Sequence, residues 1–310
     1  MPRIHVTPLA QPLPAATPPQ RMGLFQLPTG SYASRAALAF RGGRWSERRD
    51  FASTAVLVRH PAGDLLIDAG FGARAAQHIA SLPAFRRSRH RIGRSAREQL
   101  DAAGYDHRHL LGVVLTHSHW DHVSGLDSLP VPVWLAPGEQ AHAQRARGDR
   151  VFAHVAAGHR IRQYSFPGPP YAGFETSHDV HGDGSVVIVP AAGHTPGSVV
   201  VFVTLPAEEL PAQRRYAFVG DLTWQLEGIS ARAERPLLVR ALADSDAAGV
   251  RRDLGRITAL ADRVQVVPAH DARAYDGIPH LAPHLAPHLA PRPTSPEAPR
   301  GAPGTTDPHP

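Results

Sequence analysis

The sequence has neither cysteine nor lysine among its 310 residues, and its 33 basic side chains are all arginine. Without cysteine the chain can form no disulfide, bind no metal through a thiolate and use no cysteine nucleophile. Long apolar runs are also missing, because prolines interrupt the first 24 residues and leave no stretch suited to a signal peptide or a membrane span. We therefore expect no membrane partner and, by default, a cytoplasmic location. A leader removed from the chain would leave no trace in this sequence and would change that location.

The formal net charge is +6, and arginine is suited to carboxylate and phosphate partners. A nucleic-acid partner would need a clustered basic face. Such clustering occurs in one segment, which contains Arg86, Arg87, Arg89, Arg91, Arg94 and Arg97. Charge runs are usually solvated, so we expect a basic surface segment there, with an anion-attracting rim as the alternative, and no nucleic-acid partner.

Proline-rich, aperiodic sequence at both ends brackets an ordinary globular middle. Residues 1–22 suit an extended N-terminal arm, and residues 279–310 begin with three Pro-His-Leu-Ala units and continue mainly in Pro, Ala, Gly, Thr and Ser. This composition cannot form a core, so we expect a disordered tail in which the histidines belong to a linker. The prediction is one domain over residues 23–278.

Short apolar runs bounded by turn residues predict the strands. Residues 53–58 and 64–68 flank a Pro-Ala-Gly turn and predict a hairpin, and further strands are expected at 112–116, 185–189, 198–203, 216–219 and 264–267. Residues 131–135 contain Pro132, which predicts an edge strand because proline cannot donate to a neighbouring strand. Helices are expected at 138–147, at 245–261 and at 95–103, where Ser95 and Glu98 form a capping-box motif. Residues 150–182 show no assignable pattern.

The segment Thr116–His122 reads Thr-His-Ser-His-Trp-Asp-His and follows a predicted strand directly. Neutral imidazole and carboxylate are ordinary ligands of zinc, iron and manganese, and His117 and His119 point to the same side of an extended chain. Later predicted strands also lead to such side chains, namely His194, Asp221 and His270. Because loops at one end of a sheet meet in space, we expect a metal site with room for two ions.

Together these motifs resemble the metallo-β-lactamase superfamily of hydrolases, in order and in spacing. The resemblance covers about residues 23–278 and rests on His117-x-His119-x-Asp121-His122, Gly193-His194-Thr195-Pro196-Gly197, Gly220-Asp221 and Pro268-Ala269-His270. It implies a four-layer αβ/βα sandwich, an α/β (or α+β) fold in which two mixed β-sheets face each other with helices on the outer faces. It also implies two divalent metal ions. Their ligands would be His117, His119 and His194 for the first, Asp121, His122 and His270 for the second, and Asp221 as the bridge.

The implied ligand set suits Zn²⁺, and iron, manganese or cobalt accept the same donors. Two such ions about 3.5 to 4 Å apart lower the pKa of a bridging water toward ~7, so hydroxide exists at neutral pH and no protein nucleophile is required. Asp121 and Asp221 are the catalytic carboxylates expected to move protons, with Asp121 favoured. Asp68 is expected to orient a ligand imidazole by accepting its other N–H, and a simple turn cap is the alternative.

Within the superfamily, the motif spacing is closest to that of N-acyl-homoserine lactonases and related organophosphate hydrolases, so we expect a small lactone or carboxylic ester as substrate. In the lactonases a tyrosine three residues after the bridging aspartate helps to stabilise the oxyanion, and Trp224 stands there instead. An indole N–H donates one hydrogen bond but cannot titrate. We therefore expect Trp224 to form an aromatic wall, with core packing as the alternative. The rest of the pocket is expected from residues 23–50 and 138–182.

Other functions stay open at this point. A thioester hydrolase of the glyoxalase II type shares the histidine motif, although that branch has a helical, basic C-terminal region where this chain has a Pro-Ala-His tail. A phosphotriester hydrolase is a second alternative. A non-catalytic metal-binding protein that kept the fold is a third, and the complete ligand set argues against it. A homodimer is compatible with the sequence.

Overall fold

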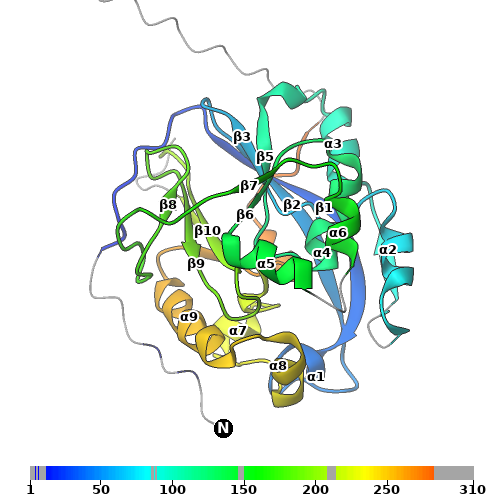
Figure 1. Cartoon of the computed structure of the whole chain (residues 1–310). Coiled ribbons are helices and arrows are strands. Elements are labelled where there is room, and N and C mark those ends of the chain that lie inside the picture. Colours follow the sequence, from blue (N-terminus) through cyan, green and yellow to red (C-terminus); the bar gives the residue numbers. More distant parts are fainter. Residues whose placement is uncertain are drawn as a thin grey trace, which may run out of the picture.

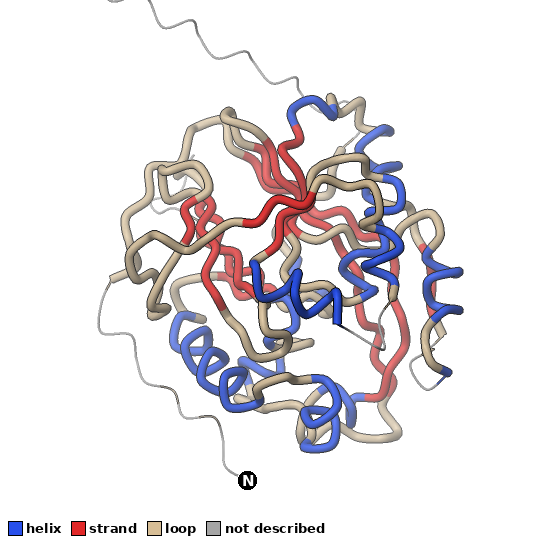
Figure 2. Tube along the Cα trace, in the orientation of Figure 1, coloured by secondary structure: helices blue, strands red, loops and turns tan. Residues whose placement is uncertain are grey.

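A computed structural model of the chain shows two β-sheets packed face to face, with helices on both outer sides (Figure 1). The structure describes residues 4, 6, 12–84, 87, 89–145, 150–207 and 214–282. In Figure 2 the strands occupy the middle of the molecule and most helices lie at its periphery. The predicted four-layer sandwich of two mixed sheets is confirmed.

The first sheet has the strand order β4-β1-β2-β3-β5-β6-β7. These strands are β1 (Gly23–Arg35), β2 (Arg48–Arg59), β3 (Asp64–Ile67), β4 (His90–Ile92), β5 (Leu110–Val114), β6 (Val133–Leu135) and β7 (Ile161–Gln163). β1 runs antiparallel to both β2 and β4, and β2 and β3 form the predicted hairpin. From β3 onward the neighbours β5, β6 and β7 are parallel, so the sheet is mixed.

The second sheet has the strand order β12-β11-β10-β9-β8. These strands are β8 (His178–Asp179), β9 (Val186–Pro190), β10 (Val199–Thr204), β11 (Arg215–Phe218) and β12 (Gln265–Val267). All neighbours are antiparallel except β11 and β12, which are parallel. Every residue of β10 is buried, as its unbroken apolar sequence predicts for a strand covered on both faces.

The helices are α1 (Ala36–Ala39), α2 (Ala75–Ser81), α3 (Ala96–Ala102), α4 (Trp120–Val123), α5 (Pro137–Arg145), α6 (Val151–Val155), α7 (Glu227–Ser230), α8 (Leu237–Ala243) and α9 (Ala247–Leu260). The three predicted helices are present as α3, α5 and α9, and the structure adds α1, α2, α4, α6, α7 and α8, which were not predicted. The predicted capping box begins α3, because the Glu98 carboxylate accepts from the Ser95 N–H at 2.7 Å and the Ser95 hydroxyl accepts from the Glu98 N–H at 3.3 Å. No helix in the described ranges is long and apolar enough to cross a membrane.

Three apolar clusters hold the layers together: one outside the first sheet, one between the sheets and one outside the second sheet. Adjacent residues of one strand enter different clusters. In β2, Leu57 faces outward and Val58 faces the other sheet, and in β10, Phe202 and Val201 divide in the same way. Successive side chains of a strand point to opposite faces, so strands that are apolar at every position require cover on both sides. This requirement explains the four layers.

Strand β6 is an internal strand, so the edge position predicted from Pro132 was wrong. It lies between β5 and β7. Pro132 precedes the first residue of β6, where its missing N–H costs no bond within the strand, and its carbonyl accepts from the Val113 N–H at 2.9 Å. The outer neighbour β7 lies in the stretch 150–182 that showed no pattern, so the prediction contained no strand beyond β6.

Contacts of the domain extend a little beyond both predicted boundaries. On the N-terminal side, the Thr17 N–H donates to the Asp183 carbonyl at 2.8 Å. On the C-terminal side, the Gln26 N–H donates to the Pro279 carbonyl at 2.9 Å. The rest of the His-containing tail, residues 283–310, lies outside the described residues, and the domain limits stay predictions.

Candidate metal centre

The predicted ligands form two adjacent groups at one end of the sandwich. The ligand atoms within each group all lie within 4.8 Å of one another. The first group is His117, His119, His194 and Asp221, and the second is Asp121, His122 and His270. These residues come from the segments that follow β5, β9, β11 and β12, with Asp121 and His122 in the short helix α4. Residues far apart in sequence therefore meet because their strands end at the same place.

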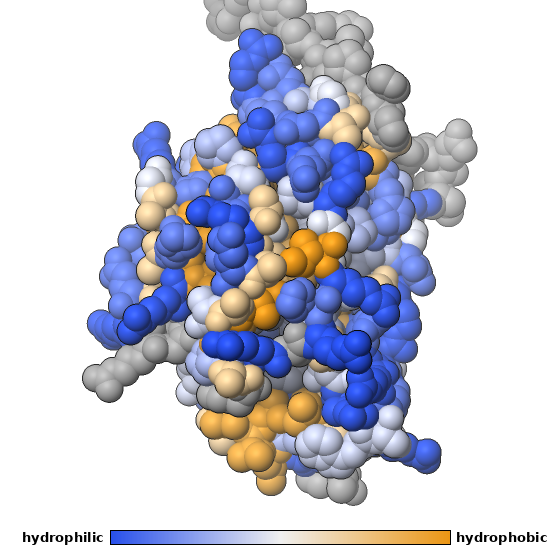
Figure 3. All heavy atoms as spheres, turned by 90° about the vertical axis from the view of Figure 1, so that its right-hand side faces the viewer, coloured by the Kyte–Doolittle hydropathy of each residue, from blue (hydrophilic) through white to orange (hydrophobic). Residues whose placement is uncertain are grey.

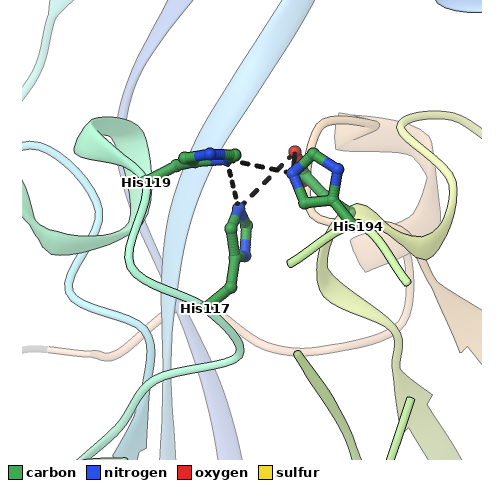
Figure 4. Close-up of side chains that lie close together, drawn as sticks. His117, His119 and His194 are labelled. Carbon is green, nitrogen blue, oxygen red and sulfur yellow. Dashed lines mark hydrogen bonds and ion pairs between the residues drawn. The ribbon is translucent and has the colours of Figure 1, made fainter. Parts of the chain in front are cut away.

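In the first group three imidazole rings turn toward one another (Figure 4). His119 Nδ1 lies 3.0 Å from His117 Nε2 and 2.9 Å from His194 Nε2. The Asp221 Oδ2 atom lies 3.7 and 3.3 Å from the same two Nε2 atoms. Burial lowers the pKa of His117 well below its ordinary value, so this imidazole is neutral and has a lone pair to offer. Converging lone pairs of this kind suit a central cation.

The second group meets the other oxygen of the same aspartate. Asp221 Oδ1 lies 3.0 Å from His270 Nε2 and 3.3 Å from His122 Nε2. The two Nε2 atoms are 3.3 Å apart, and Asp121 Oδ2 lies 3.5 Å from that of His270. Asp221 therefore turns one oxygen toward each group, which is the placement that a bridging carboxylate requires.

The charge state of Asp221 calls for cations. Burial would raise the pKa of its carboxyl, but the His270 and His117 imidazoles hold that pKa well below its usual range. Its Oδ1 atom is buried and faces the Nε2 atoms of His270 and His122 at 3.0 and 3.3 Å. A buried carboxylate is costly unless a positive charge compensates it. Imidazole and carboxylate donors are those that zinc and related divalent ions accept, so these residues fit such ions.

Despite burial, the pKa values of His122, His194 and His270 are raised by neighbouring carboxylates, of which Asp221 is common to all three. Burial alone would lower their pKa values, but neighbouring carboxylates raise them: Asp68 and Asp221 at His122, Asp221 and Asp244 at His194, and Asp221 at His270. These carboxylates draw a proton onto each ring when nothing else is bound. A divalent cation can take the place of those protons, because it satisfies the same negative charges.

Asp68 stands beside His122, one of the proposed ligands. Its Oδ2 lies 2.8 Å from His122 Nδ1, and its Oδ1 accepts from the Thr116 N–H at 2.7 Å. The backbone of Asp68 has a φ of 56°, a left-handed conformation that aspartate adopts more readily than most residues. The structure therefore places this carboxylate next to an imidazole, where it can fix the ring orientation.

A second positioning carboxylate, Asp244, was not predicted. Its Oδ1 lies 3.0 Å from His194 Nδ1 and also pairs with the guanidinium of Arg235. Arg235 in turn donates from Nη1 to the Asp221 carbonyl at 2.7 Å. Asp244 follows α8, far along the chain from His194, and no local motif marks it. Sequence reasoning had no signal for this network.

Glu139 in α5 connects two ligand loops and was also missed. Its side chain is almost completely buried, with 1% of its surface exposed. One carboxylate oxygen accepts from the Ser118 N–H at 2.7 Å and the Ser118 hydroxyl at 2.6 Å. The other accepts from the Thr195 hydroxyl at 2.5 Å and the Gly197 N–H at 3.2 Å. Ser118 lies between the proposed ligands His117 and His119, and Thr195 follows the proposed ligand His194, so one carboxylate connects these two segments.

A cavity of about 660 Å³ opens over both groups, with His119, Asp121, His194 and Asp221 among its lining residues. Its walls include residues 32–35, 38, 48 and 51, which agrees with the predicted contribution of residues 23–50 in part. The predicted contribution of residues 138–182 was wrong, since none of the described residues there lines the cavity. Helix α5 does not reach the cavity, because its Glu139 side chain packs against the segments that contain Ser118 and Thr195. Helix α8 lines this side of the cavity.

Two aromatic side chains contact the carboxylates from inside this cavity. Trp224 lines it and donates from Nε1 to Asp221 Oδ2 at 2.7 Å, so its N–H is engaged by that carboxylate. Tyr32 donates its hydroxyl proton to Asp121 Oδ2 at 2.9 Å. Burial and the Asp121 carboxylate raise the pKa of Tyr32 well above its ordinary value, so its phenol stays a donor. Tyr32 lies in β1, and nothing in the sequence links it to the histidine motif.

Comparison with known families and curated proteins gives consistent matches. The family model described as "Metallo-beta-lactamase superfamily" matches residues 48–270. The probable metallo-hydrolase Rv2300c of Mycobacterium tuberculosis and the probable metallo-hydrolase Mb2322c of Mycobacterium bovis are each 28% identical to this chain over 239 residues. Each match covers 71% of this chain and 74% of the relative.

Solved structures share the fold at low sequence identity. An N-acyl homoserine lactone hydrolase with the product N-hexanoyl-L-homoserine bound at its catalytic metal center has a TM-score of 0.63 and 15% identity, with 81% of this chain and 93% of that chain covered. A probable metal-dependent hydrolase from Staphylococcus aureus has a TM-score of 0.58 and 13% identity, covering 81% and 89%. At such identities the likeness establishes the fold alone.

Proposed function

Because the chain belongs to the metallo-β-lactamase superfamily, we propose that it is a hydrolase that uses two divalent metal ions, Zn²⁺ in the first instance, to cleave a lactone or a carboxylic ester. The observation that carries this proposal is the placement of Asp221. Its two oxygens face two separate groups of imidazoles, within 3.3 Å of His194 on one side and 3.0 Å of His270 on the other. A carboxylate so placed suits a pair of ions better than a single one.

The side chains around the cavity have distinct tasks in such a reaction. Bound at the two groups, the ions would supply a hydroxide at neutral pH and polarise the bond under attack. Asp121 faces the cavity and is the group we assign to proton transfer toward the leaving oxygen. Tyr32 holds that carboxylate and offers a neutral O–H donor. Trp224 orients Asp221 through its N–H and provides an aromatic wall.

The size and lining of the cavity support a small-molecule substrate. Its volume of about 660 Å³ lies within the range of about 300 to 1,000 Å³ common for such sites. The structurally similar lactone hydrolase holds an acyl-homoserine product at its metal centre. The volume supports a small molecule, and the similarity to that hydrolase is our reason for proposing an ester with an acyl chain.

Metal analysis combined with a substrate panel tests the proposal. Purified full-length protein is reconstituted with zinc and assayed on a lactone, a p-nitrophenyl ester, a thioester and a phosphotriester. We expect about two equivalents of bound metal and turnover of the lactone or the ester. Thioester or phosphotriester turnover alone would replace the ester assignment. A metal-replete protein that is inert on the whole panel would be a non-catalytic metal-binding protein.

Ligand variants separate the two metal groups. Asp221→Ala should reduce metal binding at both groups and lower activity by at least ~10-fold, because first-coordination ligands fix the ions. His119→Ala should weaken the first group, and His270→Ala the second, each leaving about one equivalent of metal. Glu175→Gln, whose side chain is 88% exposed, serves as the matched control. Full metal stoichiometry in Asp221→Ala would contradict the bridging assignment.

A further inference from the structure

The rim of the cavity is basic. Its lining residues include Arg35 at the end of β1, Arg48 at the start of β2, and Arg87 and Arg89 from the segment before β4. Two of these belong to the arginine-rich segment for which an anion-attracting rim was the alternative interpretation, and Arg86 of that segment lies outside the described residues. The proposed hydrolysis gives these arginines no role, because it uses only the groups at the floor of the cavity.

The arginines are close together because of strand pairing. Arg35 and Arg48 are direct partners across the antiparallel pair β1–β2, so their side chains leave the same face of the sheet. Arg89 joins them because its carbonyl accepts from the Ala33 N–H at 2.7 Å, two residues before Arg35. Like charges placed directly opposite on a sheet repel each other. The arrangement is therefore unfavourable unless an anion lies between them.

Nearby carboxylates do not provide that anion. Glu47 pairs with Arg49 at 2.6 Å, and Asp50 points to Arg91 at 3.9 Å. Across the described ranges, no hydrogen bond or ion pair joins the guanidinium groups of Arg35, Arg48 or Arg89 to a carboxylate. These guanidinium groups are free to bind a negatively charged ligand.

An apolar wall faces the same cavity. Leu38 follows the arginine end of β1, and Val239 and Leu242 of α8 also line the cavity. Leu242 is 72% exposed, and its helix neighbours Leu237 and Leu238 are exposed to a similar extent. Figure 3 shows apolar side chains gathered at the lower end of one face, the end where Figure 1 places α1 and α8. A ligand in this cavity meets both apolar surface and positive charge.

We propose that the substrate is an amphiphilic anion: an ester whose reacting carbonyl lies near Asp121 and Asp221, whose apolar chain contacts Leu38 and α8, and whose remote carboxylate or phosphate binds at Arg35, Arg48 and Arg89. This inference rests on the proposed hydrolase function for the reacting carbonyl. The anion removes the repulsion between the opposed arginines and is drawn to the cavity by their field. The apolar chain covers leucine side chains that otherwise face water.

Matched ester substrates test the charge preference. They are p-nitrophenyl esters of acyl chains of one length that end in methyl, carboxylate, phosphate or trimethylammonium. With zinc-loaded protein, we expect kcat/KM for the anionic esters to exceed that of the neutral ester about fivefold to tenfold, and to fall with added salt. In the double variant Arg35→Gln/Arg48→Gln the ratio of anionic to neutral kcat/KM should fall about twofold or more, because two of the three arginines proposed to bind the anion are replaced while Arg89 remains. Arg160→Gln, an exposed arginine away from the cavity, should retain the wild-type ratio.

The carboxylate and phosphate esters show which anion is preferred. Equal kcat/KM for anionic and neutral esters would overturn this inference and leave the hydrolase proposal standing. A preference of wild-type size in the double variant would also overturn it.

A binding measurement keeps the inference testable if every ester is inert. Calorimetry compares n-octyl phosphate with n-octanol, using both metal-loaded and metal-free full-length protein. We expect the phosphate to bind about fivefold or more tightly in both states, and this advantage to fall about twofold or more in Arg35→Gln/Arg48→Gln. An advantage that disappears with the metal would place the anion on the metal groups and refute the arginine assignment. Equal affinity for the two compounds would refute it as well.

Discussion

Replacing Glu139 by glutamine tests whether one buried carboxylate holds the ligand loops together. The change preserves the size of the side chain and converts one acceptor oxygen into a donor. If the amide oxygen keeps the two bonds from Ser118, its NH₂ group faces the Thr195 hydroxyl and the Gly197 N–H. The Thr195 hydroxyl can turn to Ser198 Oγ at 2.6 Å, but the Gly197 N–H loses its acceptor.

The expected cost follows from these contacts. A hydrogen bond to a charged group contributes ~1.5–3 kcal/mol, and a buried N–H left without an acceptor costs ~1–3 kcal/mol. Because the serine bonds remain, in weaker form, we expect Glu139→Gln to lower the free energy of unfolding by about 2–4 kcal/mol. For a protein of this size that loss corresponds to a drop in Tm of about 4–8 °C. The affinity for metal at the first group should fall about 10- to 100-fold, since the loops carry three of its ligands.

Urea denaturation of zinc-loaded and chelator-treated protein measures both effects. The loss should occur in both states, because the broken contacts are within the protein, and it should be larger with zinc. Glu175→Gln is the control, and as a change on an exposed side chain it should stay within ~0.5 kcal/mol of the wild type. Unchanged stability and unchanged zinc affinity in Glu139→Gln would refute the assigned role of this carboxylate.

Three further outcomes follow from other buried contacts. Asp244→Asn should weaken zinc binding at the first metal group by about 10- to 100-fold in a competition titration, and wild-type affinity would contradict its orienting role. Ile257 in α9 is fully buried, so Ile257→Ala should lower the free energy of unfolding measured in urea by ~2–5 kcal/mol. Leu238 is 73% exposed, so Leu238→Ala should lower it by less than ~0.5 kcal/mol. Equal losses in the two variants would mean that α9 does not pack against the second sheet as described. Burial alone would raise the pKa of Glu227, but the hydrogen bond from Arg49 lowers that pKa below its usual value. The Glu227 carboxylate therefore stabilises the fold fully above its unfolded pKa of ~4.3, and this stabilisation is lost as the pH falls through the folded pKa. Stability in Glu227→Gln should therefore vary less with pH in acid, and an unchanged pH profile would contradict the pairing.

Most strands and the proposed ligands were predicted from patterns of a few consecutive residues. The hairpin β2–β3, the capping box of α3 and the buried strand β10 each follow from a few consecutive residues, since side-chain alternation and backbone capping act over short distances. The motif from His117 to His122 belongs to the same class, because a single loop contains four potential ligands. The family that those motifs indicated is confirmed by the match to residues 48–270.

Partners across the fold escaped prediction because they depend on which segments pack together. The internal place of β6 is decided by β7, a strand of three residues with no pattern of its own. Glu139 looks like an ordinary solvent-facing helix residue until α5 packs behind the ligand loops. The wall from α8 in place of residues 138–182 has the same origin, because pocket walls are formed by whichever segments surround the strand ends.

The sequence by itself indicated most strands and the proposed ligands, because strand pattern and ligand type are properties of short segments, and the resemblance of its motifs to the superfamily implied the fold class and the type of chemistry. The tertiary structure alone decided that Asp221 turns one oxygen to each group of imidazoles, that Tyr32 and Asp244 contact those ligands, and that Arg35 and Arg48 face each other at the cavity rim. These relations join residues far apart in the chain. They depend on strand order and register, which no short segment specifies.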